Sequence, residues 1–134
     1  DNVLEALRIL NHPDGFGFGA RRMSISTCGI VPGILRLADE PMQVNLAISL
    51  HAPNDELRTK LMPVNRAYPL AKLFDAIKTY VQKSGRKVMF EYLLIDGVND
   101  TPEIADELAD LLLSENTETS TSLRAGGRKR APGI

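Results

Sequence analysis

The segment VNLAISLHAPND, residues 44–55, has the clearest structural pattern in the chain. Large apolar residues alternate with small ones through its first half, at Val44, Leu46, Ile48 and Leu50. A period of two predicts a β-strand with one buried face. The second half becomes polar and contains Pro53, so the strand is expected to end near Leu50 and to lead into a loop.

Two further strands are expected on either side, at 22–27 and 88–95. Residues 22–27 alternate in the same way, and 88–95 is rich in β-branched and aromatic residues. Apolar residues recur at helical spacing before the first strand and after each strand. Gly85 is placed to end the third of these helices, and Thr101-Pro102 to begin the last.

A helix followed by three strand–helix units predicts an α/β fold with a parallel sheet and right-handed crossovers. The pattern fits an open doubly wound sheet and an arc of a (β/α) barrel equally well. Three strands cannot close a barrel, so both outer strands are expected to have unpaired edges.

The composition indicates a soluble domain in a reducing compartment. The 134 residues include a single cysteine, Cys28, which excludes an internal disulfide and any multi-cysteine metal site built by one chain. No apolar run approaches the ~18–20 residues that span a bilayer. We therefore expect a cytoplasmic protein without a membrane segment; the sequence does not indicate an oligomeric state.

Charge divides the chain into two parts. Residues 1–116 hold 12 Lys/Arg and 16 Asp/Glu, a net charge of −4, and form the expected globular core. Residues 117–134 carry a net charge of +3 and are rich in Ser, Thr and Gly, so we expect a disordered basic tail. The acidic core gives no bulk electrostatic case for nucleic-acid binding.

Polar residues follow each expected strand, where parallel α/β folds bind ligands. The three segments are 26–29, 49–55 and 96–100. Turn formation and helix capping are the simpler explanation for any one of them, and Asn54 fits a helix N-cap. His51 could contact a ligand, although a lone histidine is more often structural.

Three other features of the sequence are weaker candidates for a functional role. The glycine-rich segment 14–19 follows a helix and precedes a strand, so it is expected at the opposite end of the sheet, with Phe16 and Phe18 against the core. Glu91 is expected either inside a polar barrel or on an exposed face. Cys28 has no neighbour that would activate its thiol, and a small buried role is expected.

Four segments resemble the radical S-adenosylmethionine (SAM) methyltransferases of adenine carbon 2 in rRNA and tRNA (the RlmN/Cfr-like family). They are RRMSISTCG (21–29), AISLHAPND (47–55), PVNR (63–66) and EYLLIDGVND (91–100). They occur in the family's order and spacing, and the resemblance covers roughly residues 1–113. It implies that the chain is an internal fragment forming an incomplete arc of a partial (β/α) barrel.

By this resemblance, Ser26, Ser49, Leu50 and His51 would contact S-adenosylmethionine. The resemblance also implies that the full-length family uses a [4Fe-4S] cluster and methylates rRNA, tRNA or both. The cluster's C-x-x-x-C-x-x-C loop, the G-E-P segment, the last strand and the methyl-carrying cysteine are absent from this sequence. No residue here is therefore assigned as catalytic or metal-ligating, and the chain alone is expected to be inactive.

Two alternatives belong to other classes. A small phosphate- or sugar-binding α/β domain would have a glycine-rich strand-to-helix turn. A non-catalytic module that binds nucleic acid would have basic residues spread over its folded part, whereas here they gather in the tail. The linked motifs favour the methyltransferase interpretation.

Overall fold

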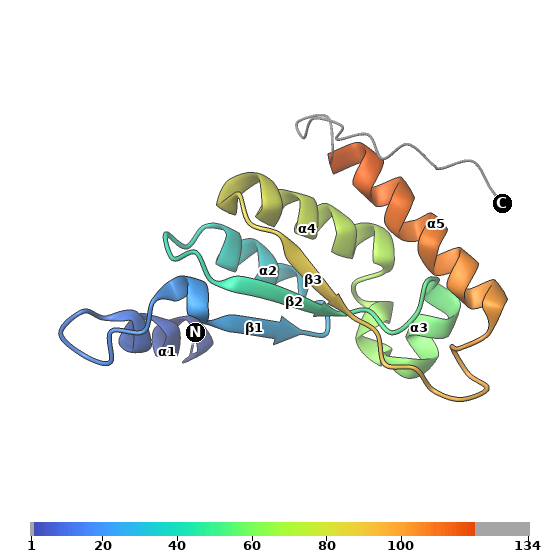
Figure 1. Cartoon of the computed structure of the whole chain (residues 1–134), viewed down its shortest axis with the longest axis horizontal. Coiled ribbons are helices and arrows are strands. Elements are labelled where there is room, and N and C mark those ends of the chain that lie inside the picture. The colour runs from blue at the N-terminus through green and yellow to red at the C-terminus, as the bar shows by residue number, and fades with distance from the viewer. Residues whose placement is uncertain (1, 120–134) are drawn as a thin grey trace, which may run out of the picture.

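The computed structural model describes residues 2–119 (Figure 1). Its elements are, in order, α1 (Asn2–Asn11), η1 (Ala20–Arg22), β1 (Ser24–Thr27), α2 (Val31–Ala38), β2 (Asn45–Ser49), α3 (Asp55–Leu61), η2 (Pro63–Arg66), α4 (Leu70–Ser84), β3 (Val88–Glu91) and α5 (Pro102–Thr119). The two η elements are 3-10 helices.

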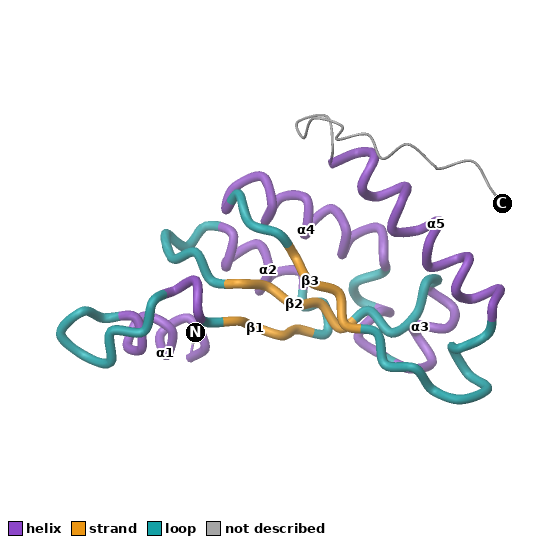
Figure 2. Tube along the Cα trace, viewed as in Figure 1, coloured by secondary structure: helices purple, strands orange, loops and turns teal. Residues whose placement is uncertain are grey.

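The strands form one parallel sheet in the order β1-β2-β3 (Figure 2). Ile25 is paired with Leu46, and Ile48 with Phe90. The expected α/β arrangement with three parallel strands is confirmed. Within the described residues β1 and β3 each pair on one side only, which leaves the open edges expected of an incomplete barrel arc.

The third strand is shorter than predicted. It ends at Glu91, so the expectation of a strand through residue 95 is wrong. The last backbone hydrogen bond between the ends of β2 and β3 runs from the Leu50 N–H to the Glu91 carbonyl (2.9 Å). Beyond it β2 has ended, and Leu94 is 70% exposed. High β-propensity does not produce a strand where no neighbour supplies the hydrogen bonds.

The two faces of the sheet differ. Leu46, Ile48 and Leu50 point into a core built with α1, α2 and α4. Figure 1 shows α2 and α4 side by side behind the sheet. The ring centroids of Phe74 on α4 and Phe90 on β3 are 5.7 Å apart. Among the described residues the other face carries no helix, and its strand positions are small or polar, except Met89.

Two short helices, α3 and η2, lie between β2 and α4, where the sequence predicted only a helix start at Asn54. The side-chain oxygen of Asn54 accepts a hydrogen bond from the Leu57 N–H (2.9 Å). This confirms the interpretation of Asn54 as an N-cap.

The turn from β1 to α2 depends on Gly29. Its φ of +101° is one that residues with a side chain rarely adopt. A Cβ at this position would lie 3.2 Å from a guanidinium nitrogen of Arg58 and 3.2 Å from a methyl of Leu73. Gly29 therefore allows α3 and α4 to approach the end of β1.

The glycine-rich loop before η1 lies where the strands begin, at the left of Figure 1, as predicted. The prediction that its two Phe rings pack against the core is wrong, because Phe16 is 69% and Phe18 46% exposed. The N–H groups of Gly15 and Gly17 both bond to the His12 carbonyl, which closes the loop on itself and away from the core.

The last helix runs through Thr119 and includes 117–119, the first residues of the segment assigned to the basic tail. Residues 120–134 lie outside the described part of the chain, so the expected disorder stays a prediction. In the part that is described, no helix is long and apolar enough to cross a membrane.

Two glycine substitutions test the helix assignments. Gly85, the cap of α4, has a φ of +66°, so Gly85→Ala should lower the free energy of unfolding by about 1–2 kcal/mol through backbone strain. Gly33 lies inside α2, and a Cβ there makes only ordinary contacts, so Gly33→Ala should raise stability by up to about 1 kcal/mol. Urea unfolding measures both; equal stability of the two variants would contradict the assignments.

Candidate functional site

The side chains of Ser26, Ser49 and Glu91 meet on the face of the sheet that carries no helix. They come from β1, β2 and β3 respectively. The Ser26 hydroxyl donates to Oε2 of Glu91 (3.0 Å), and the Ser49 hydroxyl donates to the same oxygen (3.3 Å). Three residues separated along the chain thus form one polar cluster near the carboxyl ends of the strands.

The direction of these bonds sets the chemistry of the cluster. A serine hydroxyl has one proton and two lone pairs, and each proton here is donated to the carboxylate. The remaining lone pairs and the carboxylate are all hydrogen-bond acceptors. The cluster therefore suits a ligand that brings its own donors.

His51 lies on the loop after β2 and has a φ of 60°, which is strained for a residue with a side chain. Its Nδ1 accepts a hydrogen bond from the Leu93 N–H (3.1 Å). The neutral imidazole must then carry its proton on Nε2. The Leu93 contact fixes His51 as a donor through Nε2, and Nδ1 is not available as a base.

Asn99 joins the loops that follow β2 and β3. Its amide nitrogen donates to the carbonyls of His51 (2.9 Å) and Leu93 (2.8 Å), and its oxygen accepts from the Ile95 N–H (2.6 Å). The Tyr92 hydroxyl donates to the Asn99 carbonyl, and burial raises the pKa of that phenol. This buried asparagine holds His51 in place, a role that a polar loop sequence does not reveal.

Leu50 does not join the polar cluster. Its side chain is 0% exposed and belongs to the core. Its N–H donates to the Glu91 carbonyl, and its own carbonyl accepts from Nε of Arg58. Of the four residues that were expected to converge, Ser26 and Ser49 meet directly, His51 follows on the next loop, and Leu50 supports the strand end from inside.

Arg58 fixes the ends of β1 and β2. Its guanidinium is 0% exposed and donates to the carbonyls of Cys28 (2.8 Å), Ser49 (3.2 Å) and Leu50 (3.2 Å). A further bond reaches the side-chain oxygen of Asn65 (2.7 Å). A charged residue in a short helix is normally expected to face solvent, so the sequence analysis did not identify Arg58 as a buried residue.

Asn65 and Asp55 complete the network. The Asn65 amide nitrogen donates to Oδ1 of Asp55 (2.9 Å), which also accepts from the Leu70 N–H at the start of α4 (2.8 Å). Desolvation lowers the pKa of Arg58, while the nearby Asp55 carboxylate opposes this shift. The carboxylate thus compensates the buried cation through one intervening amide.

The residues present do not fit an iron–sulfur cluster. The chain has one cysteine, Cys28, which is half-buried, and the described residues contain no group of three His, Cys, Asp or Glu side chains placed to hold a metal. Cluster ligation needs several thiolates. No reaction step through such a cluster can be assigned to these residues.

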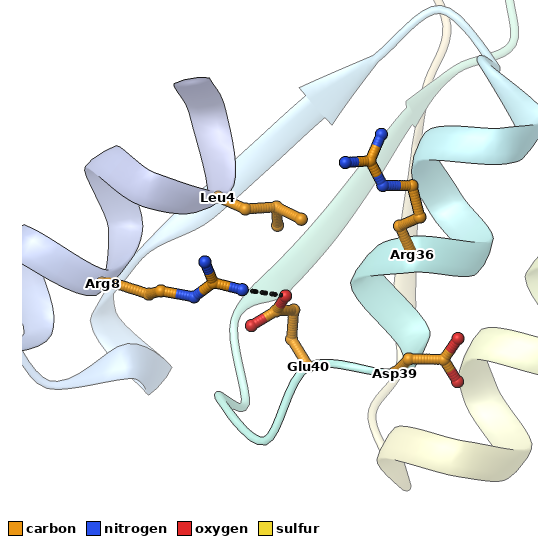
Figure 3. A pocket seen from close by; sticks show the side chains of 5 residues that line it. All are labelled: Leu4, Arg8, Arg36, Asp39 and Glu40. Carbon is orange, nitrogen blue, oxygen red and sulfur yellow. Dashed lines mark hydrogen bonds and ion pairs between the residues drawn. The ribbon is translucent and has the colours of Figure 1, made fainter. Parts of the chain in front are cut away.

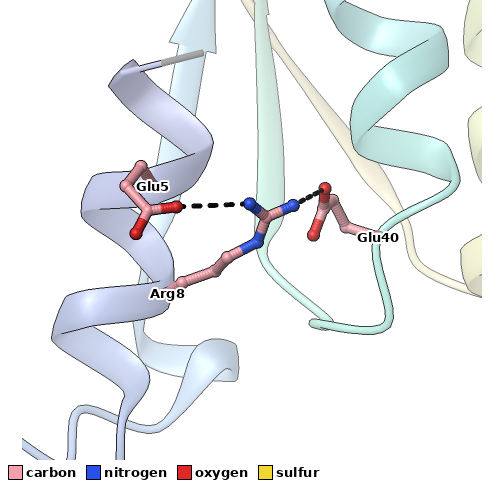
Figure 4. Close-up of polar contacts among 3 residues, drawn as sticks. All are labelled: Glu5, Arg8 and Glu40. Atoms are coloured by element: carbon pink, nitrogen blue, oxygen red, sulfur yellow. Dashed lines mark hydrogen bonds and ion pairs between the residues drawn. The ribbon is translucent and has the colours of Figure 1, made fainter.

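A hollow of about 240 Å³ lies away from the polar cluster, between α1 and the end of α2 (Figure 3). Arg8 donates to Glu40 (2.7 Å) across it and to Glu5 (3.3 Å) on its own helix (Figure 4). The hydrogen bond to Glu40 raises the pKa of Arg8. The Arg8–Glu40 pair connects α1 to the loop before β2. The mixture of charges in the hollow favours no ligand class.

The comparisons with known proteins agree with the motifs. The sequence model of the Radical SAM superfamily matches residues 1–111. The probable dual-specificity RNA methyltransferase RlmN of Thermoanaerobacter sp. (strain X514) is 60% identical over 112 residues, which are 84% of this chain and 33% of the relative. The corresponding protein of Geobacillus kaustophilus (strain HTA426) is 57% identical, over 84% of this chain and 31% of its own.

A solved structure gives the same result. The crystal structure of a radical SAM methyltransferase from Sphaerobacter thermophilus superposes with a TM-score of 0.79 at 56% identity, covering 82% of this chain and 32% of that one. The chain belongs to the radical SAM superfamily. Within it, the chain resembles the RlmN-type methyltransferases, and it spans about a third of the length of the curated relatives it matches.

Replacing Arg58 should disturb both the fold and the strand ends. Arg58→Met removes the donor to three carbonyls and to the side-chain oxygen of Asn65, so we expect the free energy of unfolding to fall by about 3 kcal/mol or more. Arg66→Met, on the exposed Arg66 of η2, is the matched control and should stay within about 0.5 kcal/mol of the parent chain. Urea unfolding measures both, and equal losses would contradict the buried network.

Proposed function

We propose that this chain forms part of the catalytic core of a cytoplasmic radical SAM enzyme that methylates carbon 2 of adenine in rRNA or tRNA. The observation that carries the proposal is the meeting of Ser26 and Ser49 on Glu91, at the end of the sheet where parallel α/β folds bind ligands. The named relatives, which are RNA methyltransferases, support the reaction class.

In this proposal Ser26, Ser49 and His51 bind S-adenosylmethionine, and Leu50 shapes the strand end beneath it. The chemistry of the cluster fits this cofactor, because the ribose hydroxyls and the ammonium group are donors and the site offers acceptors. His51 adds a donor through Nε2, which suits the cofactor's carboxylate or ring nitrogens. When bound, S-adenosylmethionine supplies the methyl group and a cationic sulfur.

The alternative of a phosphate- or sugar-binding domain has less support. Its phosphate loop would be segment 14–19, which lies at the end of the sheet where the strands begin (Figure 1), whereas Ser49 is the last residue of β2. Recognition of RNA would require surfaces other than the acidic core of residues 1–116.

A titration tests the cofactor site. S-adenosylmethionine added to the isotope-labelled chain should shift amide signals near Ser26, Ser49 and His51. Ser26→Ala and His51→Ala should each weaken binding roughly threefold to tenfold, the value of one lost hydrogen bond. Ser24→Ala is the control, because Ser24 precedes Ser26 on the same face of β1. Shifts centred on residues 15–19 instead would contradict the proposal.

Anaerobic reconstitution with iron and sulfide tests the cluster assignment. One cysteine cannot supply the thiolates that a [4Fe-4S] cluster needs, so the chain should retain no more iron than its Cys28→Ser variant. No methyl transfer is then expected from the chain alone. Stoichiometric iron that is lost in Cys28→Ser would show that Cys28 takes part in a metal site.

A further inference from the structure

Glu91 is the one charged residue among the strand positions on the face without a helix, within the described sheet. The other positions of this face are Ser24, Ser26, Asn45, Ala47, Ser49 and Met89. Arg86 contacts the face only at the far end, where it bonds to Asn45 at the start of β2. The negative charge is therefore located at the carboxyl end of the strands, beside the two serines.

Structural needs do not explain this charge. A glutamine at position 91 could accept both hydroxyl protons through its amide oxygen and would keep the same shape. Glu91 is also exposed, so it compensates no buried cation in the described residues. Both serine bonds end on Oε2, and the carboxylate keeps further acceptor capacity for a group outside the protein.

We propose that Glu91 is a specificity-determining residue that makes the cofactor site select a cationic ligand. Both serine hydroxyls are held as acceptors toward the ligand, and the carboxylate adds a net negative charge. The inference rests on the proposed cofactor site and extends it. S-adenosylmethionine, with its positively charged sulfonium, should bind in preference to S-adenosylhomocysteine, which has the same ammonium and carboxylate groups but a neutral thioether sulfur.

The expected selectivity is modest, because an exposed carboxylate is screened by water and salt. Exposed charge pairs correspond to roughly threefold to fivefold in affinity at low ionic strength. The preference for the sulfonium ligand should shrink at about 0.5 M NaCl, where the Debye length falls well below its low-salt value.

The test is a pair of NMR titrations of the labelled chain, with S-adenosylmethionine and with S-adenosylhomocysteine, each repeated at high salt. The chain should favour the sulfonium ligand, and Glu91→Gln should bind both with nearly equal affinity. Glu91→Asp, which keeps the charge, should retain part of the preference. Glu103→Gln removes the same charge from an exposed position on α5 and should leave the preference unchanged.

The outcomes separate the two proposals. An unchanged preference in Glu91→Gln, with binding still centred on Ser26 and His51, would overturn the role of Glu91 and leave the cofactor site standing. Absence of binding by the parent chain to either ligand would overturn the cofactor site and, with it, the role of Glu91. The salt series tests for an electrostatic preference in the parent chain, without any variant. A preference that does not change with salt concentration is not electrostatic, and it would also overturn the role of Glu91.

Discussion

The buried guanidinium of Arg58 sets the spacing of the strand ends on which the candidate site is built. Peptide carbonyls at the end of a strand normally turn to water or to a neighbouring strand. Here those of Cys28, Ser49 and Leu50 turn to one rigid, planar donor that is closed off from solvent. A lysine could not bond in as many fixed directions. The position of the Ser49 hydroxyl thus depends on a residue of α3 that is not itself exposed to a ligand.

The sheet separates stability from chemistry by its two faces. Side chains that alternate along β2 send Leu46 and Ile48 into the core and leave Ser49 beside Glu91. In a closed barrel the second face would be the interior. The acceptor cluster on that face has the character of a barrel lining, which fits the superposition on a radical SAM methyltransferase.

Much of the fold could be predicted from local patterns, because burial of one strand face leaves a period of two in the sequence. The pattern failed at 92–95, where composition favoured a strand but β2 had already turned away at His51. It also failed at Phe16 and Phe18, whose glycine neighbours close the loop away from the core.

For the site, the motifs indicated Ser26, Ser49 and His51, because polar residues that follow apolar strands can be recognised in the sequence alone. The partners of these residues were not visible in the same way. Arg58 and Asn99 act through side-chain bonds to carbonyls that are distant in sequence, and such bonds leave no periodic trace. Glu91 was noticed only as a carboxylate within a strand, because the serines that donate to it come from two other strands.

The close approach of Gly29 to Arg58 couples the effects of substitutions at the two positions. A methyl group at 29 would press on the guanidinium and on Leu73, and the backbone there would be strained as well. A shorter residue at 58 would remove the contact with the guanidinium, but the contact with Leu73 and the backbone strain would remain. The effects of substitutions at 29 and 58 should therefore be non-additive: a library that varies one position would rank its side chains differently according to which residue occupies the other.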